Sequence, residues 1–255
     1  MSYNLRYASL TGENSWLLRR PLVRKIIEKN SPDIIGTQEG LYFQLRQMEE
    51  DLADYAWIGL GREGGSQGEF MAVFYRKDRL EPVEYDHYWL SDRPAEIGSA
   101  TWGNKVRRMV TWVKFRDRRA RQEFVLINTH FDHEVEQSRQ KSAQLVAERM
   151  TQFRPNIPVI MTGDFNTAAG DSTSYKILTD QGGLRDAWAV AAKRGPRTRS
   201  FNGFAFPVPT DGARIDWILV RGPIGVDQIT IDDWSQNKQY PSDHFPVVAT
   251  LRFTP

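Results

Sequence analysis

Six short polar segments carry the side chains in this sequence that are best suited to chemistry. They are Asn4, Gln38-Glu39, Asn128-Thr129-His130, Gly163-Asp164-Phe165-Asn166, Ile215-Asp216 and Ser242-Asp243-His244. Oxygen donors such as those of Glu39 and Asn4 suit Mg²⁺ or Mn²⁺, while imidazoles transfer protons or bind anions. Three of the four histidines, His130, His133 and His244, lie in or beside these segments. The residue types therefore favour a hydrolytic site that uses a hard divalent cation.

Each segment has an ordinary explanation when it is taken alone. An asparagine after a strand is commonly a turn former, and Asp243-His244 could be a cap followed by a surface residue. The Gly-Asp-x-Asn sequence at 163–166 is compatible with a plain loop. All six segments, however, fall next to expected strand ends, where α/β proteins gather their active sites. Their joint occurrence is the observation that predicts a site.

The elements that would position these segments alternate between helix-like and strand-like runs along the whole chain. Apolar residues at helical spacing predict helices near 21–27, with Pro21 at the first helical position, and near 41–52, 134–153, 174–178 and 184–192. Apolar, β-rich runs after the short first strand at 1–4 predict strands at 33–37, 56–60, 70–75, 82–90, 109–115, 123–129, 157–162, 215–220, 226–231 and 246–253. Two strand-rich halves that both carry helices indicate an α/β protein (α+β in some schemes): a four-layer α/β/β/α sandwich of two packed mixed sheets with flanking helices. We expect residues 1–255 to form one domain.

Composition removes several classes of function. Hydrophobic residues make up 40% of the 255, yet no apolar run approaches the ~20 residues of a membrane helix. A net charge of +2 argues against a protein that coats nucleic acid by charge alone. The absence of cysteine excludes disulfides, thiolate zinc sites and cysteine nucleophiles. No apolar leader is visible, but residues ahead of Met1 could have been removed, so the compartment stays open. We expect a monomer.

Two generic motifs match by spacing but lack the structural context that would give them function, and a third is incomplete. Residues 59–64 fit G-x-G-x-x-G, and residues 64–68 fit G-x-S-x-G. Both patterns need a helix after the glycines, whereas here a polar loop and then a strand are expected. The His133-Glu134 pair lacks the second histidine of a helical zinc motif, because Gln137 stands in its place. A nucleotide-cofactor site, a serine hydrolase and a zincin are therefore disfavoured.

The ordered set of polar segments, with Arg214-Ile215-Asp216 and Ser242-Asp243-His244-Phe245-Pro246 as its most specific blocks, resembles the endonuclease/exonuclease/phosphatase superfamily. That group includes pancreatic-type deoxyribonucleases, abasic-site endonucleases, inositol polyphosphate 5-phosphatases, sphingomyelinases and deadenylases. The resemblance covers essentially the whole chain and implies the DNase I-like fold. The stretches 89–91, 108–112 and 128–133 look similar to small stand-alone bacterial members.

The resemblance implies metal and water-activating roles for five residues. Glu39 would be the principal ligand of Mg²⁺ or Mn²⁺, with Asn4 assisting. Asp243 would be a further ligand, directly or through water. Asp164 would orient or deprotonate the attacking water, and Asn166 would hold the phosphate or the metal's water in line.

Two histidines are expected at the phosphate. His244 would contact the scissile phosphate, and Asp216 would fix its tautomer by accepting from the other ring nitrogen. His130 would be a second imidazole, serving as an acid or a hydrogen-bond donor. By family position, Glu69 is the expected partner of His130.

Substrate contacts are predicted at Trp102, Arg108, Asn128 and Phe204, with Arg107 as a further candidate. Arginine can hold phosphate through two parallel hydrogen bonds, and aromatic rings can stack on a base or a sugar. The alternative is that Trp102 and Phe204 are core residues of long loops. His133 is more simply read as a residue at a helix start than as a substrate contact.

The resulting hypothesis is a metal-dependent phosphatase or phosphodiesterase that acts on a small or exposed phosphoester. A nuclease acting on DNA or RNA is the alternative, although the long basic loops that grip a duplex are not obvious here. A non-catalytic binding module with the same fold is a remote third reading. All three depend on the six segments converging around one cation and one phosphate.

Overall fold

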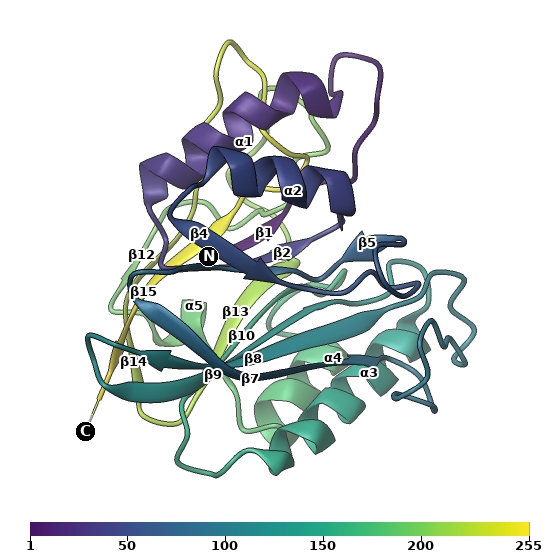
Figure 1. The fold of residues 1–255 in the computed structure, drawn as a ribbon, viewed down its shortest axis with the longest axis vertical. Helices are drawn as coiled ribbons and strands as arrows, with labels where there is room; N and C mark the ends of the chain where they lie inside the picture. Colours follow the sequence, from purple (N-terminus) through teal and green to yellow (C-terminus); the bar gives the residue numbers. More distant parts are fainter. Residues whose placement is uncertain (255) are drawn as a thin grey trace.

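The computed structural model describes residues 1–254 and contains two large mixed β-sheets packed face to face (Figure 1). The first sheet has the order β12-β14-β15-β1-β2-β6-β4, with strands β1 (Ser2–Asn4), β2 (Ile34–Gln38), β4 (Tyr55–Ile58), β6 (Val73–Arg76), β12 (Lys193–Arg194), β14 (Ile224–Ile231) and β15 (Val247–Phe253). The second has the order β11-β13-β10-β9-β8-β7, with strands β7 (Leu80–Trp89), β8 (Met109–Asp117), β9 (Gln122–His130), β10 (Val159–Asp164), β11 (Arg185–Asp186) and β13 (Asp216–Arg221). A small third sheet pairs β3 (Gly40–Leu41) antiparallel with β5 (Glu69–Phe70).

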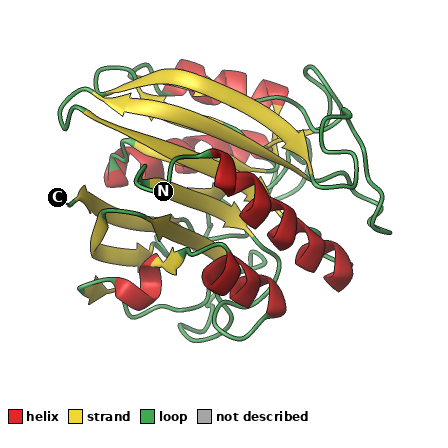
Figure 2. Cartoon of the chain, turned by 90° about the horizontal axis from the view of Figure 1, so that it is seen from below, coloured by secondary structure: helices red, strands yellow, loops and turns green. Residues whose placement is uncertain are grey.

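Helices cover the outer faces of both sheets. Figure 1 shows α1 (Trp16–Asn30) and α2 (Tyr42–Asp51) above the first sheet, and α3 (Glu136–Arg149) and α4 (Thr173–Lys176) below the second. The view from below in Figure 2 shows helices in front of the long strands that cross the molecule. Short helical segments complete the set: η1 (Met150–Gln152), η2 (Ile177–Gln181) and α5 (Ala187–Val190), the last beside β13 and β14. The predicted four-layer sandwich is confirmed.

Three apolar layers hold these elements together. Between α1, α2 and the first sheet lies a cluster that includes Ile26, Ile27 and Leu45. The sheets meet over a second cluster, and α3 packs on the second sheet through a third that includes Val146 and Met161. This arrangement explains why the central strands lack polar–apolar alternation, because both of their faces are buried.

Most predicted elements differ from the structure by a few residues at their ends, and three differ more. Helix α1 begins at Trp16, so Pro21 lies within it and not at its first position. The expected helix at 184–192 begins instead with strand β11, which pairs with β13, and only 187–190 are helical. The expected strand at 70–75 is divided into β5, which pairs with β3, and β6, which pairs with β2. In residues 1–254, no helix combines the length and the apolar character needed to cross a membrane.

One βαβ unit lies at the centre of each sheet. The parallel pair β1–β2 is connected through α1, and the parallel pair β9–β10 through α3. The registers align Asn4 with Gln38 and Asp164 with His130. Since parallel strands end at the same edge of a sheet, the two units bring four of the predicted segments to their carboxyl ends.

Candidate active site

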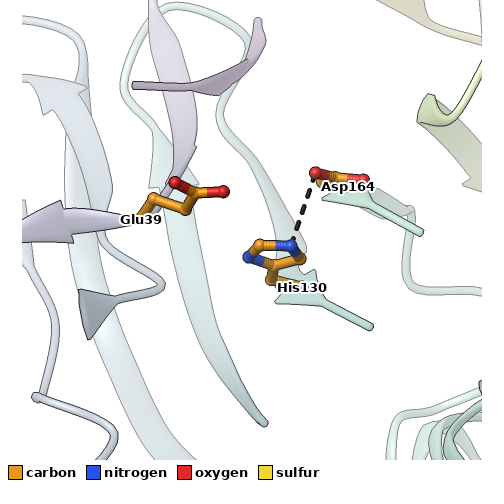
Figure 3. Close-up of side chains that lie close together, drawn as sticks. All are labelled: Glu39, His130 and Asp164. Carbon is orange, nitrogen blue, oxygen red and sulfur yellow. Dashed lines mark ion pairs between the residues drawn. The ribbon is translucent and has the colours of Figure 1, made fainter. Parts of the chain in front are cut away.

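The carboxyl ends of the two βαβ units meet at a group of polar side chains. The amide Nδ2 of Asn4 lies 3.0 Å from Oε1 of Glu39 and 3.0 Å from Oδ2 of Asp164. The same Asp164 oxygen lies 3.4 Å from Nε2 of His130, and Figure 3 shows Glu39, His130 and Asp164 directed toward one another. These atoms come from both sheets, so the site exists only when the sheets are packed together.

Glu39 follows the last residue of β2 with a left-handed backbone, at φ +63°. This conformation, uncommon for a side chain other than glycine, directs the carboxylate to a fixed place. The backbone N–H of Tyr7 donates to its Oε2 at 3.1 Å. Burial acts to raise the pKa of Glu39, but the hydrogen bond from Asn4 and the charge of His244 bring that pKa below its usual value. Glu39 is therefore held as a carboxylate.

Asp164 at the end of β10 is almost completely buried. Its Oδ1 accepts from the backbone N–H of Asn166 at 3.0 Å, while its Oδ2 faces Asn4 and two histidines. Burial, together with the nearby charge of Asp216, raises the pKa of Asp164 to about 7. A carboxyl group with a pKa near neutrality can accept a proton in one step and return it in the next.

Asp216 and His244 form a second buried pair. Nδ1 of His244 donates to Oδ2 of Asp216 at 2.9 Å, which leaves Nε2 directed toward Asp164 at 3.7 Å. Burial opposes the charge on His244, but Asp216 and Asp164 outweigh it and raise the pKa of the imidazole to about 10. His244 is therefore an imidazolium with its Nε2–H facing the site.

His130 has the opposite charge state. The side-chain amide of Asn166 donates to its Nε2 at 2.9 Å, so the ring proton is on Nδ1. Burial and the charges of Arg108 and His244 place the pKa of His130 well below its usual value. Asn166 reaches this position because its backbone is left-handed, at φ +50°.

The donor set on the Glu39 side fits a divalent cation. Two groups of carboxylates and imidazoles could each hold a metal ion, one formed by Glu39, His130 and Asp164 and the other by Asp164, Asp216 and His244. Asp243 is a further carboxylate near Glu39, since Arg6 lies 3.5 Å from Asp243 and 4.0 Å from Glu39. Within ion-pair distance, four carboxylates thus face only two cationic groups, Arg6 and His244. Hard oxygen donors with an excess of negative charge are what Mg²⁺ and Mn²⁺ require.

Glu69 lies at the site but pairs differently from the prediction. Its Oε2 accepts from Nη1 of Arg62 at 2.6 Å, and within residues 1–254 Nδ1 of His130 has no hydrogen-bond partner. Burial raises the pKa of Glu69, and the charges of Arg62 and Arg108 offset part of that rise. The expected Glu69–His130 pair is therefore replaced by a Glu69–Arg62 pair.

Asn128, predicted as a substrate contact, lies instead between the two sheets beneath the site. Its Oδ1 accepts from Gln38 at 2.7 Å and from Thr162 at 3.0 Å, while its Nδ2 donates to the carbonyls of Thr37 and Ala72. These four hydrogen bonds occupy the side-chain oxygen and the N–H groups of Asn128, so this residue positions the strand ends. The sheets approach so closely here that a Cβ on Gly36 would lie 2.0 Å from Oγ1 of Thr162.

Two predicted aromatic contacts also lie elsewhere. Trp102 is buried in the cluster under α3 and donates from Nε1 to Asp92 at 2.7 Å. Phe204 packs against the cluster between the sheets. In the same loop it is Phe201 that is exposed, with its ring centroid 5.0 Å from that of His244. In this loop, Phe204 is directed to the core and Phe201 lies next to His244.

Three arginines that the sequence analysis did not select surround the site. Arg6 and Arg62 contact its carboxylates, as described above. Arg19 on α1 is fully buried and donates to the carbonyls of residues 5, 6, 7, 14 and 241. It thus fixes the loop after β1 that presents Arg6 and Tyr7. An arginine at an inward position of an apolar helical stripe is the one sequence signal that could have revealed this role.

Comparisons with known proteins agree with this geometry. The sequence pattern of the Endonuclease/Exonuclease/phosphatase family matches residues 1–244. A family protein from Bacteroides vulgatus is 32% identical with a TM-score of 0.93, over 99% of this chain and 97% of that one. A mannosyl-6-phosphatase from Bacteroides thetaiotaomicron is 35% identical with a TM-score of 0.91, over 99% and 98%. An uncharacterized protein of Acanthamoeba polyphaga mimivirus is 31% identical over 161 residues, which are 60% of this chain and 59% of the viral protein. Among curated relatives, the chain matches between 24% and 59% of the other protein's length.

Proposed function

Because this chain belongs to the endonuclease/exonuclease/phosphatase family, whose members hydrolyse phosphoesters, we propose that it is a divalent-metal-dependent hydrolase of a small phosphoester. The observation that carries the proposal is the convergence of Glu39, Asp164 and His244 from distant parts of the sequence. The reaction is an in-line attack of water on phosphorus with departure of the ester oxygen.

The metal would be held on the acidic side of the site. Glu39 offers a partly buried carboxylate, with Asp243 on the same side and Asn4 between Glu39 and Asp164. When bound, Mg²⁺ or Mn²⁺ would withdraw charge from the phosphate oxygens. This assignment is supported by the excess of carboxylates over cationic side chains in the site.

The chain's own residues would divide the remaining work. His244 would donate from Nε2 to a phosphate oxygen, and Asp216 would keep that ring protonated and oriented. Asp164, with its pKa of about 7, would take the proton of the attacking water. Asn166, which already donates to His130, would hold that imidazole in place.

A small substrate is favoured over nucleic acid for two reasons. The relative that is 35% identical over nearly all of both chains is named as a mannosyl-6-phosphatase. The net charge of +2 also gives little of the sequence-independent attraction on which nucleic-acid binding relies. A nuclease would instead lose binding steeply as salt is added, and that behaviour separates the two functions.

The test is a substrate panel measured with Mg²⁺, with Mn²⁺ and with EDTA. It includes a chromogenic monoester, a chromogenic diester, sugar phosphates, inositol phosphates, plasmid DNA and RNA. We expect metal-dependent release of phosphate or alcohol from a small ester, and loss of it in Asp164→Asn. Undiminished turnover in EDTA, or in Asp164→Asn, would contradict the proposed site.

A further inference from the structure

A second cluster of charged side chains, formed by Arg62, Glu69 and Arg108, lies beside His130. Four buried nitrogen atoms in this region have no hydrogen-bond partner within residues 1–254: Nε of Arg62, Nε and Nη1 of Arg108, and Nδ1 of His130. Buried N–H groups are paired in nearly all native structures, so a group of them without acceptors requires an explanation. All four are donors, which indicates a place for an acceptor.

The two arginines are held in position by their backbones. The N–H of Arg62 donates to the carbonyl of Glu69 at 2.9 Å, and the carbonyl of Arg62 accepts from the indole of Trp89 at 2.7 Å. Arg108, just before β8, accepts from the N–H of Leu90 at 2.8 Å and is only 4% exposed. Such anchoring reduces the entropy lost when a guanidinium binds a ligand.

The carboxylates of this cluster leave several guanidinium donors without an acceptor. Glu69 bonds Arg62, and its charge also acts on Arg108. Asp132 is 4.0 Å from Nε of Arg108, too far for a hydrogen bond, and its Oδ1 accepts from the backbone N–H groups of Glu134 and Val135. Nη2 of Arg108 donates to His133 at 3.1 Å, which is a neutral acceptor in this contact. The two carboxylates balance the two guanidiniums in charge, but three guanidinium nitrogens stay unpaired within residues 1–254.

We propose that Arg62 and Arg108, with Glu69 between them, recognise the non-bridging oxygens of a terminal phosphate and make the enzyme selective for phosphomonoesters over phosphodiesters. This inference rests on the proposed function and adds its substrate class. It also gives Arg62, which no motif identified, a role in specificity.

The chemistry of the two esters explains the selectivity. A phosphomonoester carries a charge of about −1.5 to −2 at pH 7 and three terminal oxygens, whereas a diester carries one charge and two such oxygens. A guanidinium binds two of these oxygens through parallel hydrogen bonds. The additional oxygen and charge of a monoester would occupy the donors of Arg62 and Arg108 that a diester leaves unmet. Leaving buried donors unmet is a strong basis for rejecting a ligand.

The experiment compares wild type, Arg62→Gln and Arg108→Gln on a chromogenic monoester and the corresponding diester, with Mg²⁺. We expect kcat/KM for the monoester to fall by about ten- to a hundredfold in either variant, and kcat/KM for the diester to fall less than about threefold. Arg118→Gln is the matched control, because this arginine is exposed, pairs with Glu81 and has no role in the site. Equal losses on both esters, or no loss on either, would overturn the selectivity.

A binding measurement separates this inference from the proposed function. Inorganic phosphate should raise the unfolding temperature of wild type and Arg118→Gln more than dimethyl phosphate does, without turnover. Arg62→Gln, whose side chain is partly exposed, guards against misfolding of Arg108→Gln and should lose most of that difference. If wild type showed no turnover but was still stabilised more by inorganic phosphate than by dimethyl phosphate, the proposed reaction would be wrong and the recognition cluster would stand. Equal shifts with the two anions in wild type would overturn the cluster itself.

Discussion

Two buried aspartates at opposite ends of the sandwich show how this fold separates stability from chemistry. Asp117, at the end of β8, receives two hydrogen bonds from Arg79 and two from backbone N–H groups. Asp164, at the end of β10, receives one from the backbone of Asn166 and one from the amide of Asn4. Burial acts to raise the pKa of both. For Asp117 the hydrogen bonds and charge of Arg79 prevail and its pKa is lowered, whereas the pKa of Asp164 rises to about 7.

The number of hydrogen bonds that compensate the charge distinguishes the structural carboxylate of Asp117 from the candidate catalytic carboxylate of Asp164. Arg79 also reaches Asp33 before β2, so it connects the two sheets at the edge away from the site. Asp164 lies 3.4 and 3.7 Å from two imidazoles, near enough for attraction but not in hydrogen-bonded pairs. A charge without full compensation costs stability and remains available to a proton or a ligand.

The largest effect expected is on catalysis. Asp164→Asn should lower kcat by about a thousandfold, since a neutral amide cannot accept the proton of the attacking water. The free energy of unfolding should not fall, because the substitution removes a poorly compensated buried charge of the same shape. Turnover gives the first quantity and urea unfolding the second. If Asp164→Asn lost activity only because it was unfolded, Asp164 would have a structural role like that of Asp117.

Metal binding should produce the next largest effect. At a Mg²⁺ or Mn²⁺ concentration of 100 times Kd, the free energy of unfolding of wild type should rise by about 2.7 kcal/mol relative to EDTA. Glu39→Gln should lose most of that increment, because its carboxylate, which is held in the charged form, is the proposed principal ligand. Glu28→Gln, on an exposed turn of α1, is the control that should retain it. Equal metal stabilisation of Glu39→Gln and wild type would place the ion elsewhere.

Disruption of the Asp117–Arg79 pair should lower the free energy of unfolding by somewhat less than the metal raises it. Asp117→Asn removes the charge that Arg79 and two backbone N–H groups bind, and hydrogen bonds to charged groups contribute about 1.5–3 kcal/mol. We expect unfolding to become easier by about 2 kcal/mol, with kcat unchanged within a factor of about two. Urea unfolding and turnover measured on the same preparation provide the check. A large loss of activity would mean that the two ends are coupled.

The sequence predicted the layers and the segments at strand ends because both follow from local patterns. Apolar runs of strand length give the sheets, and Gly163-Asp164 or Asp243-His244 can be seen without any tertiary information. Contacts between distant loops leave no such pattern. Glu69 lies beside Arg62 rather than His130 because backbone hydrogen bonds within residues 61–69, among them one from Arg62 to Glu69, fold this loop back on itself.

The aromatic predictions failed for a related reason. Trp102 and Phe201 both lie among polar residues in a long loop, with a glycine one or two positions further on. Only packing decides that Trp102 is buried under α3 and that Phe201 remains exposed next to His244. Composition therefore identifies which loops border the site, and tertiary structure decides which of their side chains face it.

The smallest effect is the pH dependence of the structural end. The folded-state pKa of Asp117 is lowered from its usual value of 3.8, so its ionised form contributes stability above the unfolded-state pKa. That contribution is lost as the pH falls through the lowered folded-state pKa. The difference in unfolding free energy between wild type and Asp117→Asn should therefore be constant from pH 7 to about 5 and shrink below about 4. Urea unfolding at closely spaced pH values, with Asp54→Asn as an exposed control, measures that difference. If it stayed constant down to pH 2.5, the stability of this end would come from packing of the side chain rather than from its charge.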